Sequence, residues 1–163
     1  MKNPRVLQIE PFTPEQAGEF ERLNRAWLVE YGLLEPADET QLADPVGEIV
    51  GVGGWIFVAK LGLEVVGTAA VLPHGERVME LVKLAVAPAA QGRGAGRRLV
   101  EACIEYAKRQ GAVRLVLVSS SRLGAALGLY QRLGFQHHPM PEWVPYLTAD
   151  VYMELELSQS PVT

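Results

Sequence analysis

The feature that most constrains this chain is the stretch VAPAAQGRGAGRRL, residues 86–99. Three glycines alternate with Arg93 and Ala95, after a strand-like segment closed by Pro88 and before an amphipathic helical pattern. A helix that starts at a glycine-rich turn presents unpaired backbone N–H groups that a ligand can approach closely. The stretch therefore predicts a phosphate site, and its alternative is a glycine-rich turn that holds no ligand.

Two familiar phosphate loops do not fit this spacing. A dinucleotide loop needs Gly or Ala three residues after its second glycine, and Arg97 stands there. A P-loop needs Gly-Lys five residues after its first glycine, and here Arg97 is followed by Arg98. Hydrogen bonds from backbone N–H groups to a phosphate are worth about 1.5–3 kcal/mol each, whereas the helix dipole adds about 0.3–1 kcal/mol. We therefore expect backbone amides to do most of the anion binding, with Arg93, Arg97 and Arg98 adding local positive charge.

Length and composition limit the class of protein. The 163 residues suit a single domain, residues 1–163, and the acidic balance argues against a nucleic-acid partner. We expect no secretory signal and no membrane partner, because the N-terminus lacks an apolar segment and no apolar run reaches a membrane span. With Cys103 as the single cysteine, no intrachain disulfide can form, which favours a cytoplasmic protein.

Hydrophobic periodicity predicts an α/β (α+β) fold, with a mixed sheet and helices on its faces. Thr13 and Pro14 are expected to start the first helix, and Gly111 to end a later one. A late strand with a free edge could pair two subunits into a homodimer. The predicted strands are residues 5–12, 54–60, 63–72, 76–86, 113–119 and 150–157, and the predicted helices are 13–34, one or two short ones within 37–51, 94–111 and 121–134.

Two motifs together resemble the GCN5-related N-acetyltransferase (GNAT) family. The family's acetyl-CoA signature, Gln/Arg-x-x-Gly-x-Gly/Ala after a strand ending in Val-x-Pro, is matched by Val86, Pro88, Gln91, Gly94 and Gly96. Its second signature, Ala-x-x-Leu-Tyr-x-x-x-Gly-Phe, is matched by Ala126, Leu129, Tyr130, Gly134 and Phe135. The resemblance covers about residues 50–138 and implies a mostly antiparallel central sheet of six to seven strands, flanked by helices on both faces.

The resemblance also implies roles for individual residues. Backbone of Leu84, Ala85 and Val86 would pair with the pantetheine arm of acetyl-CoA, and the Val86 amide would stabilise the thioester oxyanion. Tyr130 would protonate the leaving thiolate. The diphosphate would be held by the loop residues Gln91, Gly92, Arg93, Gly94, Ala95 and Gly96, with Arg97 beside them.

One position departs from the family pattern. Many members carry Asn seven residues before the tyrosine, where it contacts the cofactor arm, and this chain has Leu123. We expect Ser119, or its neighbours Ser120 and Ser121, to supply a polar contact instead.

A base is needed because an amine must be neutral to attack. Glu80 is the first candidate, since it lies on the strand before the loop, where many family members place a glutamate. Strict alternation would put Glu80, Val82, Leu84 and Val86 on one face unless a bulge intervenes. In the alternative interpretation Glu80 faces water at a strand end, and the weaker candidates for the base are Glu76 and His74.

The acceptor site is expected near an acidic segment without Lys or Arg, residues 28–59. Trp27 and Tyr31, one helical turn apart, could form an aromatic wall for a cationic amine, with Trp143 and Tyr146 across the cleft. The alternative is a solvated acidic face with Trp27 in the core. The acidic residues are Glu30, Glu35, Asp38, Glu39, Asp44 and Glu48.

Other reactive side chains have simpler interpretations. Tyr130 taken alone could be a core residue, and Cys103 lies on an apolar helix stripe, which favours a structural thiol. No metal is expected, because His137 and His138 point apart in an extended chain and only His74 remains.

The sequence thus predicts an acetyl-CoA-dependent N-acetyltransferase that acts on a primary amine of a small molecule or a protein in a ternary complex. The rival interpretations are a catalytically silent acyl-CoA-binding regulatory module and a different nucleotide held in a dehydrogenase-like fold.

Overall fold

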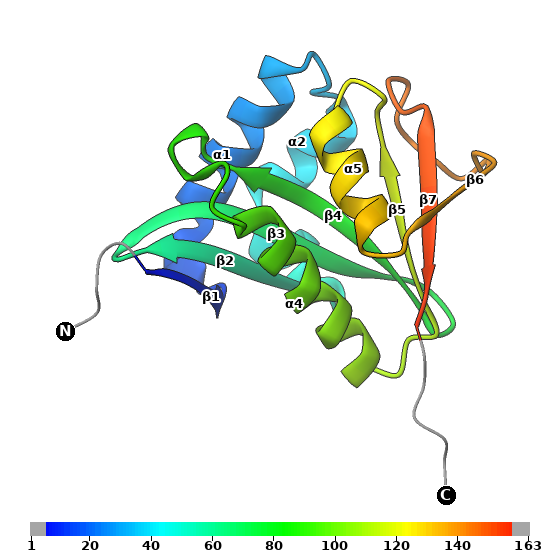
Figure 1. The fold of residues 1–163 in the computed structure, drawn as a ribbon, viewed down its shortest axis with the longest axis horizontal. Coiled ribbons are helices and arrows are strands. Elements are labelled where there is room, and N and C mark those ends of the chain that lie inside the picture. Colours follow the sequence, from blue (N-terminus) through cyan, green and yellow to red (C-terminus); the bar gives the residue numbers. More distant parts are fainter. Residues whose placement is uncertain (1–5, 158–163) are drawn as a thin grey trace, which may run out of the picture.

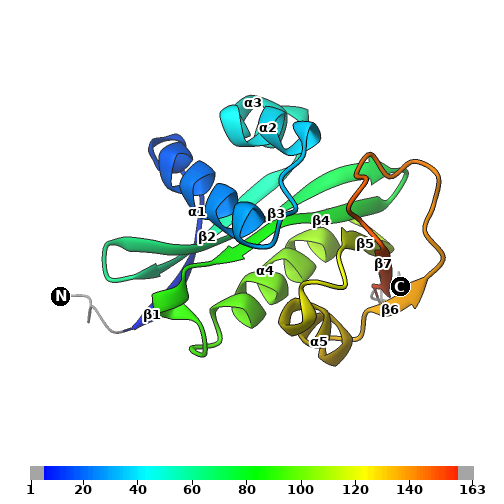
Figure 2. The ribbon, with the colours of Figure 1, turned by 90° about the horizontal axis from the view of Figure 1, so that it is seen from above.

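The computed structural model describes residues 6–157, which build one seven-stranded sheet with helices on both faces (Figures 1 and 2). The strand order is β1-β2-β3-β4-β5-β7-β6, and only β4 and β5 run parallel. The strands are β1 (Leu7–Pro11), β2 (Trp55–Leu61), β3 (Glu64–Gly75), β4 (Val78–Val86), β5 (Arg114–Ser119), β6 (Gln136–His138) and β7 (Val151–Glu156). The predicted mixed, mostly antiparallel sheet is confirmed, whereas a dehydrogenase-like fold would need a mostly parallel one.

The helices divide between the two faces of the sheet, as Figure 2 shows. One face carries α1 (Ala17–Glu30), α2 (Pro36–Ala43) and α3 (Pro45–Glu48), and the other carries α4 (Ala95–Arg109) and α5 (Gly124–Arg132). Single 3₁₀ turns lie at Pro14–Gln16, Val50–Val52 and Pro88–Ala90. Each face has its own apolar core, because the sheet separates the two helical layers. Within residues 6–157, no helix combines the length and the apolar character needed to cross a bilayer.

The predicted elements differ from the structure in three places. The first helix ends at Glu30 rather than at residue 34, because Gly32 adopts a left-handed conformation (φ 67°) that turns the chain. Strand β6 was not predicted, since three exposed residues carry no readable alternation. The last strand, β7, is flanked by β5 and, over Tyr152–Glu154, by β6, so the late strand at the edge of the sheet is β6, and pairing of two subunits stays a prediction.

The sheet opens between β4 and β5. These strands pair only from Val78 to Leu81 on β4 and from Arg114 to Leu117 on β5. Beyond Leu81, β4 continues to Val86 beside β3, and no described strand pairs with its other edge. The divergence leaves a cleft in the middle of the sheet and a stretch of β4 backbone available to a ligand.

A β-bulge at Lys83 changes which residues of β4 share a face. Val82 pairs with Ala70 and Ala85 with Thr68, so two residues of β4 oppose one of β3, and Lys83 has a φ of 56°. As a result, Val82 and Ala85 both pack on the α1 side, while Leu84 and Val86 pack on the α4 side. The expectation that Glu80, Val82, Leu84 and Val86 share one face is therefore wrong: the extra residue reverses the alternation.

A buried hydrogen-bond chain supports the bulge. The Asn24 side chain donates to the Thr68 hydroxyl (2.9 Å), and this hydroxyl donates to the Lys83 carbonyl (3.0 Å). Asn24 and Thr68 are 2% and 0% exposed, so neither group can exchange its partner for water. The chain links α1 through β3 to the one irregular residue of β4.

Candidate active site

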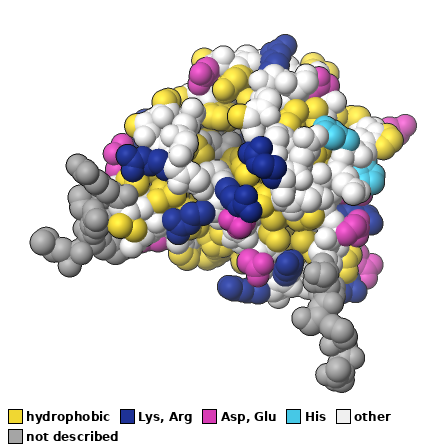
Figure 3. Space-filling view, viewed as in Figure 1, with side chains coloured by type: hydrophobic (Ala, Val, Ile, Leu, Met, Phe, Trp, Pro, Cys, Tyr) yellow, Lys and Arg dark blue, Asp and Glu magenta, His cyan; other side chains and the backbone are white. Residues whose placement is uncertain are grey.

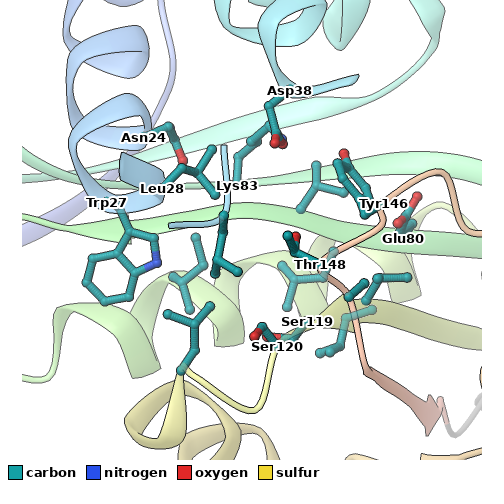
Figure 4. Close-up of a pocket in the computed structure, with 18 of the residues that line it drawn as sticks. Asn24, Trp27, Leu28, Asp38, Glu80, Lys83, Ser119, Ser120, Tyr146 and Thr148 are labelled. Carbon is teal, nitrogen blue, oxygen red and sulfur yellow. The ribbon is translucent and has the colours of Figure 1, made fainter. Parts of the chain in front are cut away.

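A pocket fills the cleft between β4 and β5, and Figure 4 shows the residues that line it. Its volume is about 790 Å³, counting the part open to solvent, which is enough for a small acceptor and the end of a cofactor arm. The pocket brings together Glu80 on β4 and Tyr130 on α5, which lie 50 positions apart in the sequence. Both side chains proposed for proton transfer thus border the same cavity.

Glu80 is largely buried in this pocket. Its burial raises the pKa to about 7, although the positive charge of Lys83 acts in the opposite direction. A carboxyl group with a pKa near neutrality can accept a proton and release it again at physiological pH. The exposed strand-end interpretation of Glu80 is wrong, because Glu80 pairs with Leu72 of β3 and Val116 of β5 in the middle of the sheet and is not an exposed residue.

Lys83 lies beside Glu80 but is already paired. Its Nζ is 2.5 Å from Asp38 Oδ1 on α2, and the two side chains are only 6% and 4% exposed. Tyr146, from the β6–β7 loop, lies near the same Asp38 carboxylate, and its ring centroid is 5.8 Å from Lys83 Nζ. Burial and the nearby carboxylates of Asp38 and Glu80 raise the pKa of Tyr146, which keeps its phenol protonated.

Glu35 fixes the β6–β7 loop over the pocket. Its carboxylate accepts hydrogen bonds from the backbone N–H groups of Leu147 (2.8 Å) and Thr148 (3.0 Å) and from the Thr148 hydroxyl (2.5 Å). Burial opposes ionisation, but these hydrogen bonds outweigh it and lower the pKa of Glu35. The clamp explains how Tyr146 and Thr148, far along the chain, come to line a site built on β4.

Tyr130 is 6% exposed and lies edge-on to Phe135, with ring centroids 5.7 Å apart. Burial, with a smaller effect of Cys103, raises the pKa of the Tyr130 phenol. The hydroxyl group therefore carries its proton throughout the neutral range, as a proton donor must. The ring is also part of the core, so the core interpretation of Tyr130 is confirmed, and its role as the acid stays a prediction.

The glycine loop has the open backbone that its sequence predicts. Gly92 and Gly94 adopt left-handed conformations (φ 81° and 79°), and a Cβ atom on either one would meet nothing within 4 Å. Helix α4 starts at Ala95 without a side-chain cap, so the first N–H groups of the helix have no partner within the helix. Gln91 folds back toward the strand, with its Nε2 donating to the Val86 carbonyl (3.4 Å).

The predicted cofactor residues form a continuous track. Leu84 lines the pocket and follows the bulge, and the unpaired edge of β4 leads from it through Ala85 and Val86 to the loop at Gln91. An extended arm could add to this edge like a strand, and a diphosphate could lie on the loop amides. These features fit acetyl-CoA, although Ala85 and Val86 do not line the pocket themselves.

The arginines next to the loop have different environments. Arg93 is exposed on the loop, Arg97 lies 3.7 Å from Glu101 on the surface of α4, and Arg98 donates to the Leu7 carbonyl (2.7 Å), which ties α4 to β1. Lys and Arg side chains gather around the start of α4 on the face seen in Figure 3. Arg98 is therefore structural, and Arg93 is the freest of the three to meet an anion.

The three serines after β5, Ser119 to Ser121, also have different hydrogen-bond partners. Ser121 binds Asp150 through its backbone N–H (2.7 Å) and hydroxyl (2.6 Å), and the Ser120 hydroxyl accepts from the Arg122 N–H (3.2 Å). Ser119 lines the pocket next to Leu123. Ser120 also lines the pocket, so of the three candidates for the polar contact that Leu123 cannot make, Ser119 and Ser120 border the cavity and Ser121 does not.

The predicted acceptor residues are only partly at the pocket. Trp27 lines it, while Tyr31 packs against Trp27 (centroids 5.2 Å apart) and is not among the lining residues. Much of the expected acidic rim has structural partners: Asp38 pairs with Lys83, Glu39 with Arg25, and Glu35 with the β6–β7 loop. Their charges are thus largely compensated before any substrate arrives.

The remaining candidates lie elsewhere. Cys103 is fully buried on α4, and burial raises its thiol pKa, which suits a structural thiol. Glu76 is exposed at the turn between β3 and β4, and His74 stacks on Trp143 (centroids 4.0 Å apart). Within the described part of the chain, no three side chains of the metal-binding types form a cluster that could hold an ion.

Lys83 and Asn24 line the pocket although sequence reasoning assigned them no role, and Glu35, expected in an acidic rim, instead holds the β6–β7 loop. The available signal was a lone lysine within the apolar strand sequence VMELVKLAV. A buried lysine needs a partner, but the sequence does not say which carboxylate supplies it.

Comparisons with known proteins agree with this geometry. Residues 10–135 match the family model described as the acetyltransferase (GNAT) family. The chain is 33% identical over 103 residues to "N-acetyltransferase family 8 member 2" of Rattus norvegicus, covering 60% of this chain and 46% of that protein. The chain therefore spans less than half the length of this curated relative.

Solved structures share the fold at lower sequence identity. A GNAT-family acetyltransferase of Staphylococcus aureus superposes with a TM-score of 0.85 at 16% identity, covering 94% of this chain and all of that one. An acetyltransferase of Salmonella typhimurium, solved with its cofactor acetyl-CoA, superposes with a TM-score of 0.74 at 20% identity, covering 96% of each chain.

Proposed function

Because the chain belongs to the GNAT acetyltransferase family, we propose that it transfers the acetyl group of acetyl-CoA directly to a primary amine within a ternary complex. The observation that carries this proposal is the pocket that Glu80 and Tyr130 share at the point where β4 leaves β5. The acetyl-CoA-bound relative supports the choice of acetyl donor.

The cofactor would lie along the open edge of β4. The loop from Gln91 to Gly96 would hold the diphosphate through its backbone amides, and Leu84, Ala85 and Val86 would pair with the pantetheine arm. Arg93 and Arg97 would add positive charge at the loop, and Ser119 a polar contact within the cleft. This arrangement directs the thioester into the pocket, with the Val86 amide as the donor to its carbonyl oxygen.

The proton transfers would follow from the protonation states that the pocket gives to Glu80 and Tyr130. Glu80 takes a proton from the acceptor ammonium, and the neutral nitrogen then attacks the thioester carbonyl carbon. As the carbon–sulfur bond breaks, Tyr130 donates its proton to the departing sulfur. The second proton, which the nitrogen loses once the carbon–nitrogen bond has formed, restores the Tyr130 phenol, and the proton on Glu80 passes to solvent. Free thiol and acetylated amine result. Tyr130→Phe should therefore lower kcat while leaving the melting temperature near that of the wild type, because Phe keeps the ring packing with Phe135.

The experiment that tests the proposal is release of free thiol from acetyl-CoA in the presence of a panel of amines. Turnover that depends on both substrates, with the acetylated amine identified by mass, is the expected result. A catalytically silent acyl-CoA-binding module would bind acetyl-CoA, seen as a rise in melting temperature, but would release no thiol with any amine. That result would overturn the proposed function.

A further inference from the structure

A second pocket adjoins the first and is joined to it through shared residues. Glu80, Val82 and Tyr146 line both cavities, so Glu80 lies at their junction. We call the second cavity the outer pocket. Its other lining residues come from α2, from the end of β3 and from the β6–β7 loop, and they are Ala37, Gln41, His74, Trp143 and Pro145.

The charges around the two pockets favour a cationic acceptor. The acidic and basic side chains that line them are Asp38, Glu80, Lys83 and His74. Asp38 and Lys83 compensate each other in their buried ion pair, which leaves Glu80 as the uncompensated charge. Neither Lys nor Arg is among the described residues that line the outer pocket, so a carboxylate on the acceptor would find no permanently charged cation there, and His74 is the one basic side chain in the lining.

Gln41, which lines the outer pocket, has a side-chain oxygen that lacks a hydrogen-bond donor in the described part of the chain. Its Oε1 atom is shielded from solvent and has no hydrogen-bond partner among residues 6–157. A buried carbonyl without a donor is costly, so native structures rarely keep one unless a ligand or ordered water satisfies it. The terminal amide turns about a broad torsion, which lets the carbonyl meet an N–H donor held in the outer pocket.

Aromatic side chains also line the outer pocket. The Trp143 ring is tilted against His74, with centroids 4.0 Å apart, and meets Tyr152 edge-on at 5.9 Å, and these two contacts fix its orientation. Trp143 is nevertheless 40% exposed, an unusual state for a large aromatic side chain held in place on both sides. An ammonium group is attracted to the face of such a ring.

Resting on the proposed acetyltransfer, we propose that the acceptor is a diamine. One amino group lies at Glu80 and is acetylated, while the second, as an ammonium group, occupies the outer pocket. There it donates to the Gln41 carbonyl and lies against the Trp143 ring. The second ammonium supplies the donor that Gln41 lacks, and a diamine carries no carboxylate that the pocket would leave unpaired.

The test compares acceptors of equal chain length by kcat/KM with acetyl-CoA. The series runs from propane-1,3-diamine to hexane-1,6-diamine, each beside the matching n-alkyl monoamine, with lysine as the carboxylated counterpart of pentane-1,5-diamine. We expect the best diamine to exceed its monoamine by about tenfold or more, the scale of one hydrogen bond to a charged group. Lysine should be used more poorly than pentane-1,5-diamine.

Variants of Gln41 connect this preference to the outer pocket. Gln41→Leu should reduce the diamine-to-monoamine ratio by about tenfold, whereas Gln41→Glu, which keeps the acceptor and adds charge, should preserve or raise it. Thr40→Val, at an exposed position on the same helix, is the control and should keep the wild-type ratio. Melting-temperature shifts with each amine give a second readout that does not require turnover.

The possible outcomes separate this inference from the proposed function. Equal use of diamines and monoamines by the wild type, or loss of both in the same proportion in Gln41→Leu, would overturn the diamine inference and leave acetyltransfer intact. Absence of thiol release with every amine would overturn the proposed function itself.

Discussion

At the scale of single residues, the site depends on the carboxyl group of Glu80. Its pKa is raised to about 7 by burial, while Lys83, whose charge would lower that pKa, is held by Asp38. The protein thus keeps a base near neutrality by pairing the neighbouring cation with another carboxylate. Sequence reasoning found Glu80 from its position before the glycine loop, but the environment that sets its pKa comes from α2 and from the β6–β7 loop.

This pKa leads to a prediction for the pH dependence of kcat/KM. The wild type should lose activity below pH 7, about tenfold per pH unit, because Glu80 must be ionised to accept a proton. Glu80→Gln should lower kcat/KM by about 10²–10⁴-fold at pH 8 and should remove the break near pH 7, since neutral amine must then come from solution. Glu76→Gln, at the exposed turn, is the matched control, and a break near pH 7 that persists in Glu80→Gln would contradict the assignment.

The raised pKa of Glu80 also leads to a prediction for the stability of the fold. The pKa of Glu80 is higher in the folded state (about 7) than its ordinary value of 4.5, so the native protein holds this proton more tightly. Its contribution to stability is present below pH 4.5 and is lost as the pH rises to 7, by up to about 3 kcal/mol. Relative to the wild type, Glu80→Gln should therefore gain stability between pH 5 and pH 8. Urea unfolding at both pH values measures this difference, and an unchanged difference would count against a buried Glu80.

At the scale of the elements, the irregular point of β4 decides the shape of the site. The bulge at Lys83 turns Leu84 and Val86 to the α4 side and places Lys83 against Asp38. The Thr68 hydroxyl, which holds the Lys83 carbonyl, is thus a positioning group for the strand edge proposed to bind acetyl-CoA.

Removing this hydroxyl tests the role of the bulge. Thr68→Val keeps the side-chain volume but leaves the Lys83 carbonyl without its buried donor, which should cost about 1–3 kcal/mol of unfolding free energy. The KM for acetyl-CoA should rise as well, because the edge of β4 loses its fixed direction. Urea unfolding and initial rates measure the two effects, with the exposed Thr40→Val as the control. A destabilised variant with the wild-type KM would show that the bulge only serves stability.

At the scale of the whole molecule, the cleft unites parts from both helical layers. The acetyl donor is proposed to enter from the α4 side, whereas Asp38, which pairs with Lys83 near Glu80, comes from α2 on the opposite face of the sheet. Contacts outside the sheet help to hold the two sides together: Arg122, just before α5, donates to the carbonyls of Tyr31 (3.2 Å) and Gly32 (3.1 Å) at the end of α1.

Binding of acetyl-CoA across this cleft should stabilise the whole fold. At a concentration 100 times its Kd, the ligand adds about 2.7 kcal/mol, which a melting curve detects. Gly94→Ala should largely abolish the shift, because it strains a left-handed residue and adds a Cβ atom where the diphosphate is proposed to bind. Gly111→Ala carries the same strain (φ 83°) at the other end of α4 and should keep the shift. Equal shifts in the two variants would contradict the placement of the diphosphate.

The sequence by itself determined the features that local interactions encode. Strand, glycine turn and helix follow from hydrophobic period and backbone freedom, which is why the loop at Gln91–Gly96 and the order of most elements could be predicted. Only the tertiary structure decided the bulge at Lys83, the ion pair with Asp38 and the clamp of Glu35 on Thr148, because each depends on a partner distant in the sequence. Pairing across such distances leaves no periodic trace in the chain, so the site's electrostatics appear only once the sheet and its two helical layers are assembled.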